Sequence, residues 1–279
     1  MKSAIYELKR SESLKVRSLF RGPYLELIIP SVTECNSPGR IWVDDLSSPQ
    51  TAFMWDKGHS YYLVGSPDNE AYNLAVEGLI REQIMPEHRK RESINPVFKL
   101  FGSLEVWQAI FKSIFKDLQL DKMARRFYVF KSRKIDSWRD KIPDGFAMER
   151  IDARFLKEPR LTNRNVVMDE ISSAWDSIDD YLRKGFGFAL VHGGEEVACW
   201  CTAEYVSRDK CGIGIATLQK YQRKGFATLT ACAFVDHCVS NDIAPYWDCW
   251  DDNIASIGVA EKVGFELATK YEILFGSLS

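Results

Sequence analysis

The first 130 residues contain short apolar runs that predict strands and longer apolar stripes that predict helices. The strand pattern, four or five consecutive β-branched, aromatic or aliphatic residues, occurs at 40–43, 52–55, 61–64 and 126–130. Between the second and third runs, Asp-Lys-Gly at 56–58 indicates a hairpin turn, because glycine accepts a positive φ. Apolar residues at helical spacing predict two helices, one capped by Asp68 and one by Ser103.

The second half of the chain shows the same mixture of patterns with longer elements. Strands are predicted at 148–151, 188–192, 197–206, 211–218 and 244–250, with one or two more over 267–275. Helices are predicted around 171–183, 226–240 and 253–262, the last ending at Gly264 as a helix C-cap. This order of strands and helices predicts a mixed α/β fold.

A polar segment at 136–146, which contains Pro143 and Gly145, lacks periodicity and predicts the connection between two halves. At roughly 150 residues per domain, two domains are expected. We therefore predict an N-terminal α/β domain at 1–140 and a second domain at 141–279. The order of elements in the first loosely resembles that of the second.

Composition excludes several classes of protein. Apolar residues make up 46% and charged residues 27%, which is ordinary for a globular protein. The net charge is -2, divided as +4 over residues 1–140 and -6 over 141–279. An acidic second half favours a cationic substrate and disfavours nucleic acid.

The cysteines and the chain's first residues bear on metal binding and location. Six of the seven cysteines fall between Cys199 and Cys249, no CxxC pair occurs, and there are four histidines. This pattern predicts free thiols in a reducing compartment and no metal site. The start, MKSAIYELKR, lacks the apolar core of a signal peptide, and no apolar run approaches the ~18 residues of a membrane span. We expect a cytoplasmic protein without a membrane partner.

One segment combines features that bind phosphate. The predicted strand ending at Leu218 leads into a basic loop with Arg223, Lys224 and Gly225, and then into an apolar helix. The start of a helix exposes unpaired N–H groups and the positive end of the helix dipole. Glycine permits close approach of the backbone, and the two cations add attraction. The loop lacks the GxxxxGK[ST] pattern, which disfavours nucleoside triphosphates.

This loop resembles that of the GNAT superfamily of N-acetyltransferases, whose pattern is [QR]-x-x-G-x-[GA]. Gln222, Gly225 and Ala227 match it, and Asn253-x-x-Ser256 and the EKVGF at 261–265 fall where the family keeps them. The resemblance covers about 148–279. The residues that precede this segment, together with the YWDC at 246–249, make the chain similar to the branch that includes zwittermicin-resistance acetyltransferases. That branch carries an extra N-terminal domain.

The resemblance implies a GNAT fold with a mixed, splayed sheet and acetyl-CoA in the V between the 211–218 and 244–250 strands. Backbone groups at 216–218 would pair with pantetheine, and the amides of 223–227 would hold the pyrophosphate. The implied CoA-binding residues are Ala216, Thr217, Leu218, Gln222, Arg223, Lys224, Gly225, Phe226, Ala227, Asn253 and Ser256. For Asn253 a helix N-cap is the structural alternative, and for Lys224 a solvated lysine.

The catalytic groups depart from the family pattern. Ala260 occupies the position where relatives often have a tyrosine that protonates the leaving thiolate, and Gly212 and Gly214 occupy positions where they tend to have a carboxylate. Among the remaining carboxylates near the predicted cleft (Glu204, Asp248, Asp251 and Asp252), we favour Asp248 as base or amine anchor. Ser256, Tyr271 or solvent remain as proton donors, and we favour Ser256. Cys249 is interpreted as a packed strand cysteine.

Aromatic residues crowd the same region, and they divide between the two faces of the predicted strand. Alternate members of 246–250 face opposite sides, so some belong to the core. The others, with Trp200, could form an aromatic wall that attracts an amine cation.

The sequence therefore predicts an acetyl-CoA-dependent N-acetyltransferase that acts on the primary amine of a small molecule by direct attack on the thioester. The alternative is a degenerate GNAT module that binds CoA or a protein partner without turnover. The acceptor, the acyl-chain preference and the oligomeric state stay open.

Overall fold

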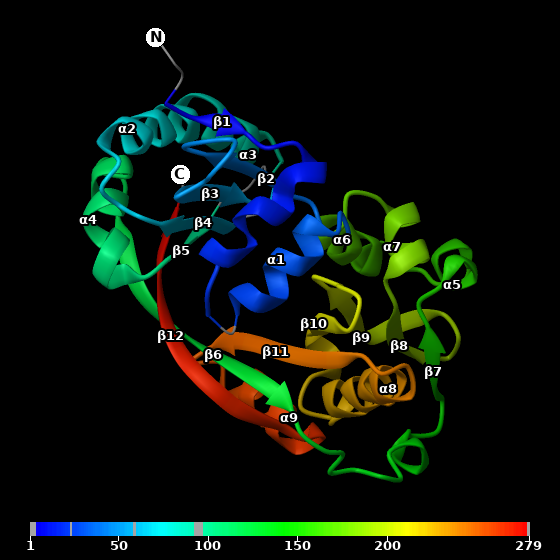
Figure 1. Ribbon diagram of the computed structural model, residues 1–279. Coiled ribbons are helices and arrows are strands. Elements are labelled where there is room, and N and C mark those ends of the chain that lie inside the picture. The colour runs from blue at the N-terminus through cyan, green and yellow to red at the C-terminus, as the bar shows by residue number, and fades with distance from the viewer. Residues whose placement is uncertain (1–3, 23, 58–59, 92–96, 278–279) are drawn as a thin grey trace. The chain divides into compact units, whose positions relative to one another are not determined.

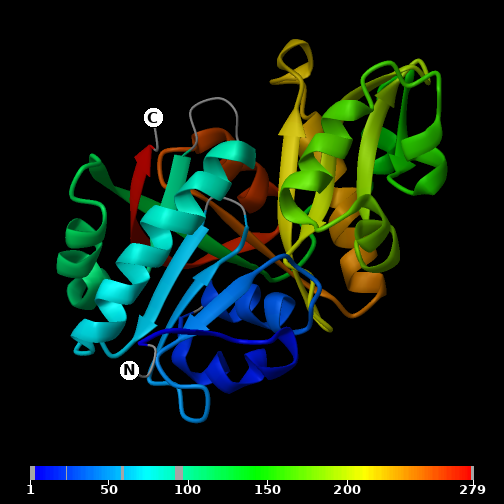
Figure 2. The ribbon, with the colours of Figure 1, turned by 90° about the horizontal axis from the view of Figure 1, so that it is seen from above.

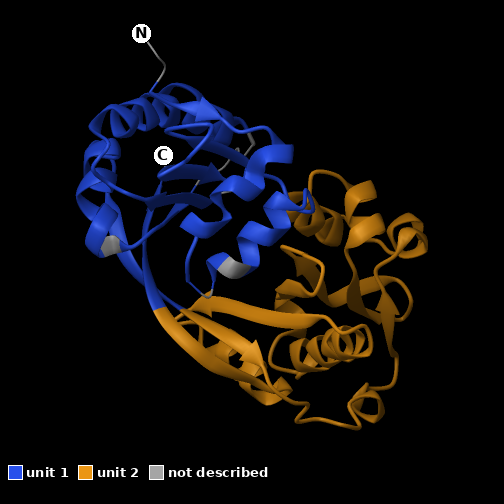
Figure 3. Ribbon diagram, in the orientation of Figure 1, with its two compact units in different colours: residues 1–125, 271–279 blue, residues 126–270 orange. Residues whose placement is uncertain are grey.

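The computed structural model describes residues 4–22, 24–57, 60–91 and 97–277, and Figure 1 labels its helices and strands. The chain forms two compact units (Figure 3): residues 1–125 with 271–279, here unit 1, and residues 126–270, here unit 2. The predicted boundary at 140/141 therefore differs from the division after Arg125. The polar segment is fastened to unit 2, because Trp138 Nε1 and Arg139 both donate hydrogen bonds to Asp236, at 2.9 and 3.0 Å.

Unit 1 is an α/β unit whose sheet takes its last strand from the end of the chain. Across that sheet lie β1 (Tyr6–Glu7), β2 (Arg40–Val43), β3 (Thr51–Trp55), β4 (Ser60–Gly65), β5 (Val97–Phe101) and the end of β12 (Phe265–Ser277). Its helices are η1 (a 3-10 segment, Arg10–Leu19), α1 (Leu25–Thr33), α2 (Glu70–Leu79), η2 (a π-helical turn, Ile80–Ile84), α3 (Met85–Arg91) and α4 (Leu104–Ile114). The strands pair antiparallel except for β4 and β5, which are parallel.

Helix α2 begins one residue later than the sequence predicts. Its N-cap is Asn69, whose Oδ1 accepts a hydrogen bond from the backbone N–H of Tyr72 at 3.1 Å. Asp68 instead accepts from the Ser66 hydroxyl in the preceding turn. The apolar faces of α2 and α4 pack on the sheet in one buried cluster that includes Tyr61, Trp107 and Leu274.

Unit 2 has a longer mixed sheet flanked by helices. Across the sheet lie β7 (Phe146–Arg150), β8 (Gly187–His192), β9 (Glu196–Glu204), β10 (Lys210–Thr217), β11 (Ala244–Trp250), β6 (Leu120–Phe130) and the start of β12. The helices are η3 (Arg139–Lys141), α5 (Ala153–Lys157), α6 (Asn165–Ala174), α7 (Ile178–Lys184), η4 (Gln219–Tyr221), α8 (Phe226–Ser240) and α9 (Ile254–Val263). Neighbouring strands are antiparallel from β7 to β10, and β10 and β11 are parallel.

The helix predicted over 171–183 is two helices. Trp175 ends α6 in an extended conformation, and its indole N–H donates to the carbonyl of Ala203 at 3.1 Å. Ser177 then caps α7 by accepting from the N–H of Asp180. The periodicity continued through the break because Trp175, Ile178 and Leu182 all face the core or its margin.

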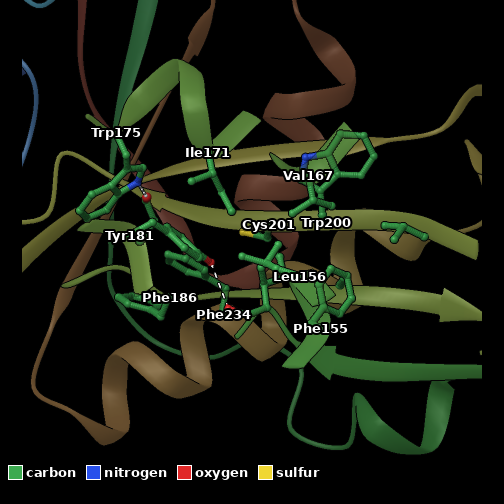
Figure 4. Close-up of a cluster of buried hydrophobic side chains, with 14 of the residues drawn as sticks. Phe155, Leu156, Val167, Ile171, Trp175, Tyr181, Phe186, Trp200, Cys201 and Phe234 are labelled. Atoms are coloured by element: carbon green, nitrogen blue, oxygen red, sulfur yellow. Dashed lines mark hydrogen bonds between the residues drawn. The ribbon is translucent and has the colours of Figure 1, made fainter. Parts of the chain in front are cut away.

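Helices cover the two faces of the unit 2 sheet. Alternation along β9 turns Trp200 toward α6, and Figure 4 shows its indole beside Val167. The neighbouring Cys201 lies on the other face with Cys211 and Cys238 of α8. Trp175 and Tyr181 anchor the α6–α7 layer through hydrogen bonds to backbone carbonyls, drawn as dashed lines in Figure 4.

Candidate active site

The parallel strands β10 and β11 diverge shortly after they begin. Their register pairs are Lys210 with Ala244 and Cys211 with Pro245, after which the pairing stops. Figure 2 shows the yellow β10 and the orange β11 running in different directions. Helix α8 follows the end of β10, and α9 follows the end of β11. The V that the sequence predicts thus lies in unit 2, with the start of a helix after each arm.

One arm of the V has peptide groups that its sheet neighbour does not use. The N–H of Leu218 donates to the carbonyl of Ala198 on β9 at 3.0 Å. Because such bonds alternate along an antiparallel pair, the peptide groups of Ala216 and Leu218 face β9, whereas those of Ile215 and Thr217 face the V. The carbonyl of Thr217 accepts from Gln222 Nε2 at 3.2 Å. Thr217 is therefore the predicted strand residue best placed for backbone pairing with a ligand.

The loop between β10 and α8 has a backbone that suits an anion. Arg223 has φ 60° and Gly225 has φ 81°, both in the left-handed region, and Gly225 is the N-cap of α8. A Cβ on Gly225 would meet nothing within 4 Å, so space is open in front of the helix. Phe226 is buried, whereas Gln222, Arg223 and Lys224 are exposed. The first N–H groups of α8 lack intrahelical acceptors and can bind phosphate oxygens.

A tyrosine that the sequence analysis did not select anchors this loop. The hydroxyl of Tyr221 donates to Glu196 Oε2 at 2.7 Å and lies 3.2 Å from His192 Nδ1. Lys220 forms an ion pair with the same carboxylate at 2.7 Å. Burial, and then the Glu196 carboxylate, raise the pKa of Tyr221 to about 12, so the phenol stays protonated as a donor. These contacts tie the loop to the β8–β9 hairpin.

Asn253 caps the start of α9, which is the structural role predicted as an alternative to CoA binding. Asn253 Oδ1 accepts from the N–H of Ser256 at 3.0 Å. The Ser256 hydroxyl accepts from the indole N–H of Trp247 at 2.9 Å, which leaves its own proton available to donate. Ala260, in the position where relatives often have a tyrosine, is fully buried.

Two carboxylates occupy the space beside Gly214 of β10. A Cβ on Gly214 would collide with Oε1 of Glu204 and would lie 3.0 Å from Oε1 of Glu170. Glu204 belongs to β9, and Glu170 comes from α6. Two neighbouring elements thus bring carboxylates to a position on β10 where the glycine has no side chain. Sequence reasoning named Glu204 and missed Glu170, for which its position inside an apolar helical stripe offered no distinguishing signal.

Burial changes the acidity of Glu170. Desolvation raises the pKa of Glu170 above the usual range of glutamate. The Trp200 indole N–H, which is buried and makes no hydrogen bond of normal geometry within the described residues, partly offsets this rise in pKa. The Cys201 thiol also has a raised pKa, chiefly from burial, with smaller contributions from both carboxylates.

The remaining sequence candidates lie on β11 and just after it. Tyr246, Asp248 and Trp250 alternate with the buried Trp247 and Cys249, as the strand pattern predicts. Since Lys210 pairs with Ala244, the face with Asp248 is also the face of Gly214. Tyr246 stacks on Phe127 with ring centres 5.3 Å apart. Cys249 packs in the cluster against α8 and α9, consistent with a core cysteine.

The two acidic residues after β11 have other surroundings. Asp251 forms ion pairs with Arg126 and Lys270, which hold its pKa below the usual range. Asp252 is exposed in the turn before α9. Both fit the interpretation that they are turn residues rather than catalytic groups.

The described part of the chain has neither a cluster of metal-binding side chains nor a helix that could span a membrane. Residues 4–22, 24–57, 60–91 and 97–277 include no group of three or more His, Cys, Asp or Glu side chains arranged to hold a metal ion. Within the same ranges no helix has the length and apolar character needed to cross a bilayer. All seven cysteines are free, and Cys211 and Cys238 approach to 3.9 Å between their sulfur atoms.

The splayed sheet, with a helix start after each arm, is the arrangement that the predicted acyltransferase fold requires. The sequence profile of the family described as GNAT acetyltransferase matches residues 17–274, and the chain belongs to that family. It is 28% identical over 273 residues to YdfB, an uncharacterised N-acetyltransferase of Bacillus subtilis, covering 98% of this chain and 99% of that protein.

Solved structures agree on the fold. A GCN5-related N-acetyltransferase-like protein from Streptococcus suis superimposes with a TM-score of 0.66 at 20% identity, covering 95% of this chain and 98% of that chain. A tandem GNAT protein from the clavulanic acid biosynthesis pathway superimposes with a TM-score of 0.55 at 12% identity, covering 99% and 98%. The predicted GNAT fold is confirmed, and the structural similarity covers 95% and 99% of this chain in the two cases.

Proposed function

We propose that this acyltransferase transfers the acetyl group of acetyl-CoA to the primary amine of a small molecule. The observation that carries the proposal is the V between β10 and β11, which opens beside a glycine-bearing, basic helix start. A thioester of CoA combines an extended amide chain with a pyrophosphate, and the V offers groups for both. Backbone of β10 suits the amide chain, and the N-terminus of α8 suits the pyrophosphate.

Particular residues support each part of this assignment. The Thr217 peptide would pair with pantetheine, with Ala216 and Leu218 on either side of it. The amides of residues 223–227 would hold the pyrophosphate, with Arg223 and Lys224 adding charge. Gln222 keeps the loop against the end of β10 through its bond to Thr217. Asn253 and Ser256 would line the pantetheine from the second arm, in addition to capping α9.

The chemistry requires a proton acceptor for the amine and a proton donor for the thiolate. Asp248 of β11 and Gly214 of β10 lie on the same face of the sheet, where the Asp248 carboxylate can anchor an ammonium ion. Ser256 is the candidate donor, because its oxygen is held by Trp247 while its proton remains free to donate. The excess of acidic residues in the second half favours a cationic acceptor. Seven free cysteines support a reducing, cytoplasmic setting.

Calorimetric titration with acetyl-CoA tests the cofactor site. Gly225→Val places a β-branched residue at φ 81° in the middle of the loop, and we expect it to abolish binding. Gly22→Val is the control, because Gly22 also has a positive φ, 124°, and lies in unit 1, outside the loop and the hairpin that holds it. Binding that survives in the Gly225 variant, or disappears equally in the Gly22 variant, contradicts the assignment.

A second candidate function, CoA binding without turnover, is favoured by the buried Ala260 in place of a proton-donating tyrosine. Release of free thiol from acetyl-CoA in the presence of a panel of primary amines separates the two. Tight binding with no thiol release above the rate in buffer supports the second candidate, and acetylation of any amine supports the first.

A further inference from the structure

We propose that Glu170 and Glu204 form a carboxylate pair that binds the ammonium group of the acceptor and takes its proton. This inference rests on the proposed transfer of an acetyl group to an amine. It names the groups that replace the missing carboxylate of β10, and it narrows the class of acceptor.

The geometry brings the two carboxylates to one place. Both approach the position that a Cβ of residue 214 would occupy, one from β9 and one from α6. Any side chain at 214 would displace Glu204, so the glycine is the condition for the pair. Gly214 lies on the arm of the V where backbone groups face the thioester chain. The pair is therefore next to the position at which an attacking nitrogen must arrive.

The surroundings of Glu170 favour its protonated form. Glu170 lies between Val167 and Ile171, both buried, and the Trp200 ring covers the same side of β9. Burial raises the pKa of Glu170, with a smaller, opposite contribution from the Trp200 indole N–H, so Glu170 is the carboxyl that holds a proton more readily. Titratable or charged groups on this face of the neighbouring strands include Lys210 of β10 and Tyr246 and Asp248 of β11, with Cys201 on the opposite face of β9.

The proton count of the reaction fits such a pair. An arriving ammonium ion gives one proton to the ionised carboxylate of the pair, which makes the nitrogen lone pair available. That lone pair forms the bond to the acetyl carbonyl carbon, the carbon–sulfur bond breaks, and its electrons leave with the sulfur. The nitrogen gives its second proton to water. The thiolate takes a proton from water, or from Ser256, which then regains one from water. The pair then returns its proton to water.

The charge of the pair defines the acceptor class. Two adjacent carboxylates attract an ammonium ion and repel a carboxylate beside it. The acceptor is therefore a cationic amine whose nitrogen has no neighbouring carboxylate, such as a diamine, rather than an α-amino acid.

Three variants test the pair: Glu170→Gln, Glu204→Gln and, as matched control, Asp169→Asn, an exposed neighbour on α6. Calorimetry with acetyl-CoA comes first, and we expect all three to bind as the wild type does. If the wild type itself does not bind acetyl-CoA, the proposed cofactor site is wrong. That outcome is distinct from failure of the carboxylate pair, which the binding of the amine tests. Binding of 1,4-diaminobutane in the presence of CoA should weaken at least tenfold in both Glu variants and not in the control.

Infrared titration provides a readout that needs no acceptor. The wild type and the Asp169 variant should show a protonated carboxyl band that titrates above the ordinary glutamate pKa of about 4.3 and that Glu170→Gln removes. Where 1,4-diaminobutane is acetylated, kcat/KM should fall about 100-fold or more in each Glu variant. Glycine should be a far poorer acceptor. An unchanged band in the Glu170 variant, or diamine binding equal to the control, overturns the proposal.

Gly214→Ala provides a second, independent variant. It keeps both carboxylates but displaces Glu204 from its place over β10. We expect diamine binding to weaken as in the Glu204 variant, with acetyl-CoA binding retained. Unchanged diamine binding would contradict the role of the glycine.

Discussion

The two units of the chain follow the same order of elements but differ where a parallel strand meets its helix. In unit 1, β4 pairs in parallel with β5 and leads into α2; in unit 2, β10 pairs in parallel with β11 and leads into α8. The first turn of α8 is preceded by Arg223, Lys224 and Gly225. The start of α2 is closed by the Asn69 cap between Asp68 and Glu70.

This difference places the candidate chemistry in one unit. Acidic residues and an occupied cap at the start of α2 repel a phosphate, whereas a basic loop with an open glycine at the start of α8 attracts it. Our interpretation of the N-terminal half as a degenerate GNAT-like lobe stays a prediction, and the shared order of elements supports it. The same arrangement of strands and helices is compatible with either junction, so the fold alone does not determine which unit binds CoA.

The largest expected effect concerns the glycines at the two junctions. A Cβ on Gly65, at φ 93°, would lie on the carbonyl oxygen of Gln50, whereas one on Gly225 has open space. Gly65→Ala should destabilise the protein by about 3 kcal/mol or more, from strain and overlap together. Gly225→Ala should cost about 1 kcal/mol from its backbone conformation alone. Urea unfolding measures both, and equal losses would show that the junctions do not differ.

The charges at the two junctions should affect CoA binding in one unit only. Replacing Arg223 and Lys224 together by Ala should weaken acetyl-CoA binding about 10-fold or more and flatten its salt dependence. Replacing Asp68 and Glu70 by Ala should leave the affinity unchanged. Wherever binding is still measurable, calorimetry should give a stoichiometry of one acetyl-CoA per chain for each of the two double variants. A stoichiometry of two would contradict the comparison.

The two asparagine caps allow a smaller, more specific test. Asn69→Ala and Asn253→Ala each remove a side-chain cap and should each cost about 1 kcal/mol of stability. Only Asn253→Ala should also raise the KM for acetyl-CoA, if the residue lines the pantetheine as we propose. An unchanged KM would leave Asn253 with its capping role alone.

The smallest expected effect is on acid stability. The pKa of Asp251 is lowered by hydrogen bonds to Lys270 and then Arg126, which join β11 to β12 and β6. In unit 1, Glu12 has a pKa lowered by its local partner Lys15. A carboxylate whose folded-state pKa is lowered contributes stability above its unfolded-state pKa, and this contribution is lost as the pH falls through the folded-state pKa. Asp251→Asn should therefore reduce the unfolding temperature at pH 7 more than Glu12→Gln. The difference should shrink as the pH falls below about 4 and vanish only below the lowered folded-state pKa of Asp251.

Local pattern was a good guide in the second half of the chain. The strand at 244–250 and the helix at 226–240 have the predicted bounds, because apolar periodicity and glycine turns define them within a few residues. Pattern failed where tertiary contacts decide. The single helix predicted at 171–183 breaks at Trp175, whose indole bonds to Ala203 on a distant strand.

The sequence by itself determined the family, the strand-to-helix loop with Gln222, Gly225 and Ala227, and the caps of α9, Asn253 and Gly264. These features depend on neighbouring residues and on backbone conformation, which local sequence encodes. Tertiary structure alone decided that Glu170 of α6 joins Glu204 beside Gly214, and that Tyr221 fastens the loop to Glu196. Side chains from separate elements come into contact only when the sheet and its helices pack. The spacing of residues along the chain does not predict such contacts.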